Sequence, residues 1–134
     1  MIVAADSVTK PGDAAGKVLV GGSHEGIVSA WFAAQSGARA VILHDAGVGK
    51  DASGIAGLAW LEKLGMAAAA VSHTSARIGD GADVLANGLI SHANAHARAL
   101  GVVAGMPCKD AAVRLARAQP PIGPVPDYRN GART

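Results

Sequence analysis

Three short apolar runs, each with a histidine at its end, constrain the fold of this chain more than any other feature. The runs span residues 17–24, 38–45 and 66–73, and each stops at polar residues or glycine. Continuous apolar runs of this length are typical of strands buried on both faces of a parallel sheet. The third run is rich in alanine, and we predict a strand there because Gly65 ends the helical stretch before it.

Helical stretches lie between and after these runs, at residues 27–36, 52–64, 83–100 and 107–118. Strands that alternate with helices indicate a parallel sheet with right-handed crossovers. We therefore predict a small three-layer α/β/α domain on a parallel sheet of three or four strands, Rossmann-like or flavodoxin-like in type. Residues 2–5 are the candidate for the fourth strand.

Composition narrows the class of protein. Half of the residues are apolar and 16% are charged, which is typical of a folded domain. The net charge of +2 comes without a basic stripe, so we expect no nucleic-acid partner. No apolar run reaches about 18 residues, so we expect no membrane partner. The single Cys108 and the absence of a secretory signal in residues 1–10 favour a cytoplasmic location.

The C-terminal part of the chain differs from the rest. We predict one α/β domain over residues 1–118 and a Pro-rich tail or arm over residues 119–134. Four prolines between positions 120 and 126 exclude a helix and favour an extended segment. The tail is either a disordered end or an arm on a neighbouring subunit. A narrow sheet in so apolar a chain leaves helix faces uncovered, so we expect a homo-oligomer. Its interface would include residues 55–60 or the helix face that carries His92.

The histidines indicate where a site would lie. Ligands bind beyond the carboxyl ends of the strands in open parallel sheets. His24, His44 and His73 each end one run, so they would converge there, unless each merely caps the helix that follows. We predict that His24 and His73 share the general acid and base roles. Asp45 would orient one of them, since histidine suits proton transfer near neutral pH.

Residues beside these histidines would hold the substrate. The predicted contacts are Ser23, Gly47, Gly49, Lys50, Ser75 and Arg77. Glycines would let a ligand approach the backbone, and the two cations suit a carboxylate. Arg77 is otherwise a solvated surface residue. Ser23 lies in a near miss of a nucleophile elbow and is otherwise a helix N-cap.

No cofactor or metal is predicted. The loop at residues 21–26 lacks the dinucleotide fingerprint, and residues 44–51 lack the phosphate-loop spacing. His24, Asp45 and His73 are suitable zinc ligands, but no local spacing supports a metal site. His92 and His96 lie away from the loops on the predicted third helix, and we assign them to packing or an interface. Cys108 is predicted to be inert.

The leading function is a small-molecule enzyme that acts on an anionic, carboxylated substrate, with a hydrolase as first choice. A lyase or isomerase would use the same acid–base groups. The alternative class is a non-catalytic subunit that binds small anions or regulates a larger assembly.

Overall fold

A computed structural model describes residues 1–121 and 123–126, and only the backbone of Lys50 and Asp51. It contains a five-stranded sheet in which neighbours in space are also neighbours in sequence. The strands are β1 (Ile2–Ala5), β2 (Val18–His24), β3 (Ala40–His44), β4 (Ala67–Val71) and β5 (Ile90–Ala93). β1 to β4 are parallel, and β5 is antiparallel to β4. The predicted α/β fold on a parallel sheet is confirmed, including residues 2–5, whereas the antiparallel β5 was not predicted.

The strand order differs from that of Rossmann and flavodoxin sheets. Those sheets reverse their direction of growth at a switch point, and the ligand crevice opens there. In this chain the order β1-β2-β3-β4-β5 never reverses. The strand order therefore provides no switch-point crevice in the described sheet.

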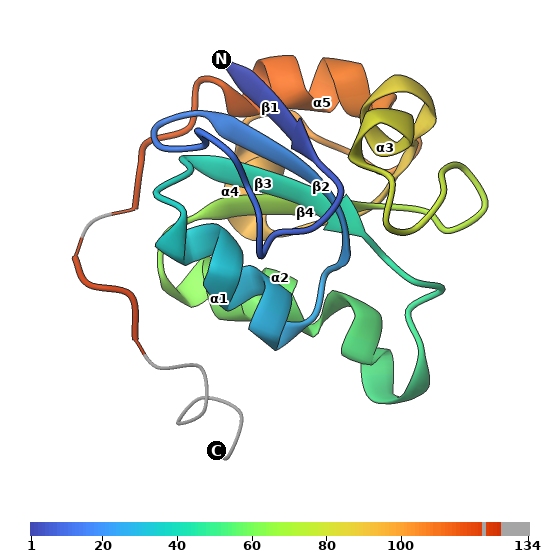
Figure 1. Ribbon diagram of the computed structural model, residues 1–134, viewed down its shortest axis with the longest axis horizontal. Helices are drawn as coiled ribbons and strands as arrows, with labels where there is room; N and C mark the ends of the chain where they lie inside the picture. The colour runs from blue at the N-terminus through green and yellow to red at the C-terminus, as the bar shows by residue number, and fades with distance from the viewer. Residues whose placement is uncertain (122, 127–134) are drawn as a thin grey trace.

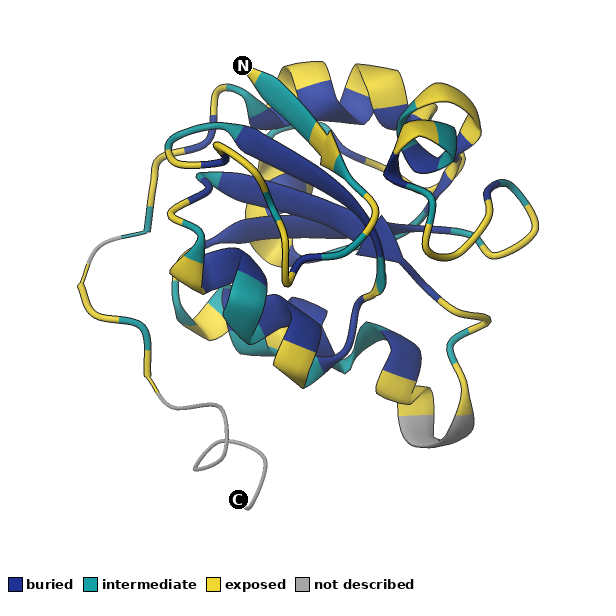
Figure 2. Ribbon diagram, in the orientation of Figure 1, coloured by how far each residue is buried: buried dark blue, intermediate teal, exposed yellow. Residues whose placement is uncertain are grey.

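Helices lie against both faces of the sheet. Figure 1 shows α1 (Ile27–Gln35) and α2 (Ala56–Lys63) on one face, with α3 (Gly81–Asn87) and α5 (Cys108–Leu115) on the other. Right-handed crossovers that proceed in one direction put their helices on the same face, which explains the position of α1 and α2. The central strands are buried on both faces (Figure 2), as their continuous apolar sequences predict.

Two core clusters fill the space between the sheet and these helices. Alternate residues of the strands enter opposite clusters: Leu19 and Val41 pack toward α1 and α2, while Val20 and Ile42 pack on the other side. Gly57 of α2 lies so close to α1 that an added Cβ would be 2.8 Å from the Cβ of Ala30. The small residues of α2 therefore allow helix packing within one chain.

The predicted helix over residues 83–100 is wrong. α3 ends at Asn87, Gly88 is extended, β5 follows, and α4 (Ala95–Ala99) is a separate short helix. Asn94 is the N-cap of α4, and its Oδ1 accepts hydrogen bonds from the amides of Ala97 and Ala68. Its Nδ2 donates to the carbonyls of Met66 and Leu58. These contacts with distant segments override the helical propensity of the alanines and leucines.

The predicted helix over residues 52–64 is divided. A 3₁₀ helix, η1 (Lys50–Ile55), precedes α2. α1 and α5 agree with the predicted stretches within a few residues at each end.

The described part of the tail runs beside the domain (Figure 1). Val125 packs against the core cluster beneath α1 and α2. The predictions for residue 122 and residues 127–134 lie outside the described residues. Among the described helices, none has the length and apolar character needed to cross a membrane.

Candidate functional site

The loop between β4 and α3 crosses the carboxyl ends of the strands. We call residues 74–80 the crossing loop; it lies beyond the strand ends in Figure 1. His44 Nε2 donates to the carbonyl of Ala76 over 2.8 Å, which fixes the loop to β3. The amide of Gly79 donates to the carbonyl of Gly22 over 2.7 Å, which fixes it to β2.

The glycine at position 22 is required by this crossing. A Cβ there would lie 2.6 Å from the carbonyl carbon of Gly79 and 2.8 Å from the oxygen of Asp6, and would also meet the amide of Asp80. The close approach that glycine permits here is thus to the chain itself.

The crossing loop divides the carboxyl edge into two hollows. The first has a volume of about 720 Å³ and lies beside β3 and β4. Its polar side chains come from His44, His73, Thr74, Ser75, Arg77 and Asp83. The second has a volume of about 400 Å³ and lies beside β1, β2 and α1. Ile78 lines both hollows.

Asp45 and His73 form a pair at the wall of the first hollow. Oδ1 of Asp45 lies 3.5 Å from Nδ1 of His73, and it accepts hydrogen bonds from the amides of Gly47 and His73. The side chain of Asp45 is 4% exposed, whereas that of His73 is 58% exposed. The carboxylate is therefore held in place behind an imidazole that solvent and ligands can reach.

The environment of Asp45 keeps it ionised. Burial alone would raise the pKa of its carboxyl. Hydrogen bonds from Gly47, Ser91 and His73, with the charge of His73, outweigh burial and lower the pKa below its ordinary value. A buried carboxylate that stays charged can orient an imidazole and stabilise its protonated form.

His44 and Ser75, which the sequence suggested for the site, are both engaged in hydrogen bonds to the backbone. His44 is 2% exposed, and its Nδ1 accepts a hydrogen bond from the amide of Ala46 while Nε2 donates to the crossing loop. Ser75 Oγ donates to the carbonyl of Ser72 and accepts from the amide of Leu89. Neither side chain is left available as a nucleophile or base.

Arg77 lines the first hollow together with Asp83. Asp83 Oδ2 accepts a hydrogen bond from the amide of Arg77 over 2.7 Å, and Oδ1 accepts from Asn87. The hydrogen bond from Asn87, then that from Arg77, lowers the pKa of Asp83. Asp80 is the N-cap of α3, and its side chain accepts a hydrogen bond from the amide of Asp83. Arg77 is exposed and lines the first hollow.

His24 and Ser23 lie in the second hollow, apart from His73. Ser23 Oγ accepts a hydrogen bond from the amide of Val8, so it anchors the β1–β2 connection. The N-cap of α1 is Gly26. The structure thus does not bring the two predicted acid–base histidines into one hollow.

The loop after β3 has an unusual backbone. Ala46, Gly47, Val48 and Gly49 all have positive φ, and φ of Val48 is 71°. A β-branched residue in this region is strained. Gly47 lies against the His73 ring, since an added Cβ would be 3.7 Å from its Cγ. The predicted contact of Lys50 lies outside the described side chains.

Glu25 is a buried acid in the turn between β2 and α1. It is 0% exposed, and neither carboxyl oxygen has a hydrogen-bond partner among the described residues. Burial raises the pKa of Glu25 well above its ordinary value, and the nearby Leu43 amide opposes this only partly. Its own amide donates to the carbonyl of His44, so it sits next to the Asp45 loop.

The remaining histidines and the cysteine lie elsewhere. His92 is on β5 with Nδ1 3.0 Å from Ser91 Oγ, and His96 Nε2 is 3.0 Å from the carbonyl of Glu62. Burial raises the pKa of Cys108 to about 12, which makes it a poor nucleophile. The described residues contain no group of three His, Cys, Asp or Glu side chains that could hold a metal ion.

Comparison of this chain with protein-family models, curated proteins and solved structures finds no match.

Proposed function

We propose that this protein is an enzyme that acts on a small carboxylated substrate in the first hollow by acid–base catalysis, with hydrolysis as the first reaction class. The pairing of Asp45 with His73 carries the proposal. It combines a buried, ionised carboxylate with a half-exposed imidazole 3.5 Å away, at the wall of a cavity of about 720 Å³. Such a pair is the usual means of holding a histidine ready for proton transfer.

In the proposed hydrolysis, His73 transfers the proton, Asp45 orients His73, and Arg77 binds the substrate. His73 turns Nδ1 toward Asp45, which leaves Nε2 for a water molecule. Nε2 takes a proton from that water as it attacks the substrate's acyl carbon, and the imidazolium returns the proton to the leaving group. Arg77 holds the substrate carboxylate, since a guanidinium suits this geometry. A lyase or isomerase reaction would use the same groups.

A second candidate is a subunit that binds small anions without catalysis. It is favoured by the engagement of His44 and Ser75 in hydrogen bonds to the backbone. Among the described residues, the first hollow therefore has no hydroxyl nucleophile next to His73 except Thr74, which shares a hydrogen bond with Ser72.

A panel of esters and amides that carry a free carboxylate tests the proposal. Turnover should fall by about 10²–10⁴-fold in His73→Gln, the usual contribution of a positioned acid or base. His96→Gln is the matched control, because His96 lies outside both hollows. Binding without turnover would favour the second candidate. Turnover that survives His73→Gln unchanged would refute the assignment of His73.

A further inference from the structure

We propose that the ligand has two parts, and that an apolar part crosses Ile78 from the first hollow into the second. The substrate class is then an elongated carboxylate with an apolar chain or ring. This inference rests on the proposed function for the contact between the carboxylate and Arg77. Its apolar half depends on other residues and can fail separately.

Ile78 is the residue that joins the two hollows. It lines both of them, and 56% of its surface is exposed. Its neighbours in the crossing loop are Arg77 on one side and Gly79 on the other. An exposed isoleucine between two cavities offers apolar area that a ligand can cover.

The backbone on both sides of Ile78 is fixed. The amide of Arg77 donates to Asp83 Oδ2, and the amide of Gly79 donates to the carbonyl of Gly22, each over 2.7 Å. These bonds hold the Cα of Ile78 in place between the two hollows. A contact surface that is already in place costs less conformational entropy when a ligand binds.

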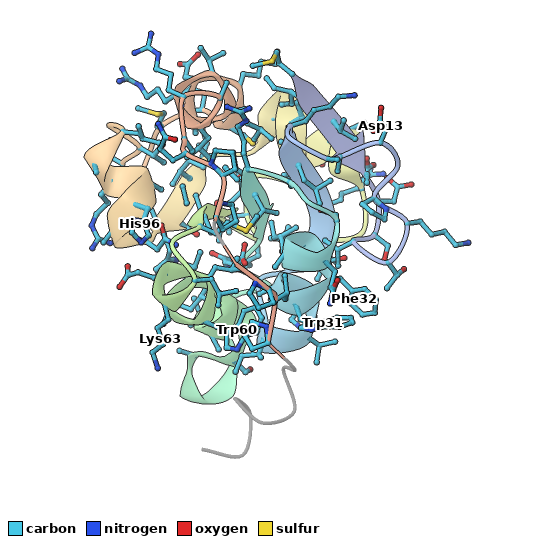
Figure 3. The ribbon with its side chains drawn as sticks, turned by 90° about the vertical axis from the view of Figure 1, so that its left-hand side faces the viewer. Asp13, Trp31, Phe32, Trp60, Lys63 and His96 are labelled. Atoms are coloured by element: carbon cyan, nitrogen blue, oxygen red, sulfur yellow. The ribbon has the colours of Figure 1, made fainter. Side chains whose placement is uncertain are left out.

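Apolar side chains continue the surface of Ile78 into the second hollow. Val8, Val28 and Phe32 line it, and Val28 is 46% exposed. The ring of Phe32 packs edge-on against Trp31 with centroids 5.1 Å apart, and Figure 3 shows the two rings side by side on α1. The Phe32 ring in the wall of this hollow thus has a second ring packed against it.

Charge orients the ligand across Ile78. The second hollow is lined by Asp6, and none of its lining residues among those described is a lysine or arginine. The first hollow is lined by Arg77 and also by Asp83, whose two carboxylate oxygens already accept hydrogen bonds from the amide of Arg77 and the side chain of Asn87. The carboxylate of an elongated ligand therefore belongs at Arg77, and its apolar end belongs beside Val28 and Phe32.

Binding of straight-chain carboxylates tests the inference. The probes are acetate, butyrate, hexanoate and octanoate, and their affinities are measured by NMR titration at one pH and ionic strength. In the wild type, affinity should rise by about fourfold for each methylene that reaches the second hollow. In Ile78→Ser this rise should flatten, whereas Ile78→Leu should retain it.

Matched variants separate the two halves of the ligand. Val113→Ser removes a 60% exposed valine on α5, outside both hollows, and should leave the chain-length dependence intact. Arg77→Gln should weaken all four probes by the same factor, whereas Arg114→Gln on α5 should weaken none.

The outcomes are distinguishable. Equal affinities for acetate and octanoate in the wild type would overturn the inference. So would a chain-length dependence that is the same in Ile78→Ser as in the wild type. An acetate affinity that does not change in Arg77→Gln would instead contradict the anion contact of the proposed function.

Discussion

Asp45 and Glu25 are buried carboxylic acids in adjacent loops, and their surroundings act on them in opposite directions. Asp45 receives backbone hydrogen bonds that lower its pKa, whereas Glu25 has no hydrogen-bond partner among the described residues and its pKa is raised. Asp45 is therefore charged in the folded protein at neutral pH. Glu25 favours the neutral form over a wider pH range than an ordinary glutamate does.

Asp45→Asn should destabilise the protein. The loss of hydrogen bonds to a charged, buried group lowers the free energy of unfolding by about 1–3 kcal/mol at neutral pH. Because the folded pKa is lowered, the stabilisation is complete above the ordinary aspartate pKa and is lost as pH falls through the folded value. Urea unfolding across this pH range measures the difference. Asp13→Asn is the control, since the Asp13 side chain is 86% exposed.

Glu25→Gln should change how stability depends on pH. With a raised folded pKa, the contribution of Glu25 is fully present below the unfolded pKa and is lost as pH rises toward the folded pKa. The wild type should therefore lose stability above about pH 4.3, the ordinary glutamate value, and the variant should lack this loss. Glu62→Gln, which changes the only other glutamate, is the control. The same pH slope in Glu25→Gln and wild type would contradict the assignment.

At the scale of the elements, the crossing loop decides the shape of the carboxyl edge of the sheet. It is fixed to β3 through His44 and to β2 through Gly22, and the start of α3 is fixed to Asp6, which follows β1, because the amide of Gly81 donates to Asp6 Oδ1. Without a switch point in the strand order, this loop is what separates the edge into two hollows.

Gly22→Ala should displace the crossing loop. The added Cβ would collide with the backbone of Gly79 and Asp80, which cannot move without breaking the loop's contact with β2. We expect a loss of carboxylate affinity together with a lower free energy of unfolding. Gly105→Ala is the control: it introduces strain at φ +90 in open space, at a residue that lines neither hollow, and costs about 1 kcal/mol. Unchanged affinity in Gly22→Ala would show that the loop position does not matter for binding.

The sequence predicted the strands better than the segment after the crossing loop. β2, β3 and β4 follow from apolar runs, because strands buried on both faces need no polar alternation. The stretch around Gly88 and Asn94 could not be assigned in this way. Its alanines and leucines favour a helix locally, whereas pairing with β4 and the hydrogen bonds of Asn94 to distant carbonyls decide the outcome.

The candidate site was predictable only in part, because contacts between segments that are distant in sequence also determine its shape. His73, Ser75 and Arg77 are close in sequence, so they had to be close in space. The separation of His24 from them depends on the contact between Gly79 and Gly22, which links residues far apart in the chain. A glycine pair such as Gly21-Gly22 indicates that another segment packs closely against the backbone there. It does not indicate which segment of the chain that is.

At the scale of the whole molecule, assembly is still a prediction. Several large apolar side chains are exposed, including Val28, Val103 and Val113. Exposed apolar surface in a chain of this size favours association. Val125 packs on the core cluster beneath α1 and α2, and the described tail lines a hollow with Ala34, Lys63 and Leu64, at the C-terminal ends of these two helices.

Light scattering should therefore give a mass at least twice the 13.2 kDa of the chain. Removal of residues 120–134 should weaken this assembly, because the tail would no longer contribute to the interface. A stable monomer at micromolar concentration would refute the homo-oligomer. An unchanged oligomer after truncation would refute only the role of the tail.

The most direct test of the central claim follows all five histidines by NMR while acetate is added. If the first hollow binds carboxylates between His73 and Arg77, the ring signals of His73 should shift in a saturable way. The same shift should be absent in Arg77→Gln, and the rings of His92 and His96 should stay unchanged throughout. Saturable shifts at His92 or His96 with none at His73 would contradict the placement of the site.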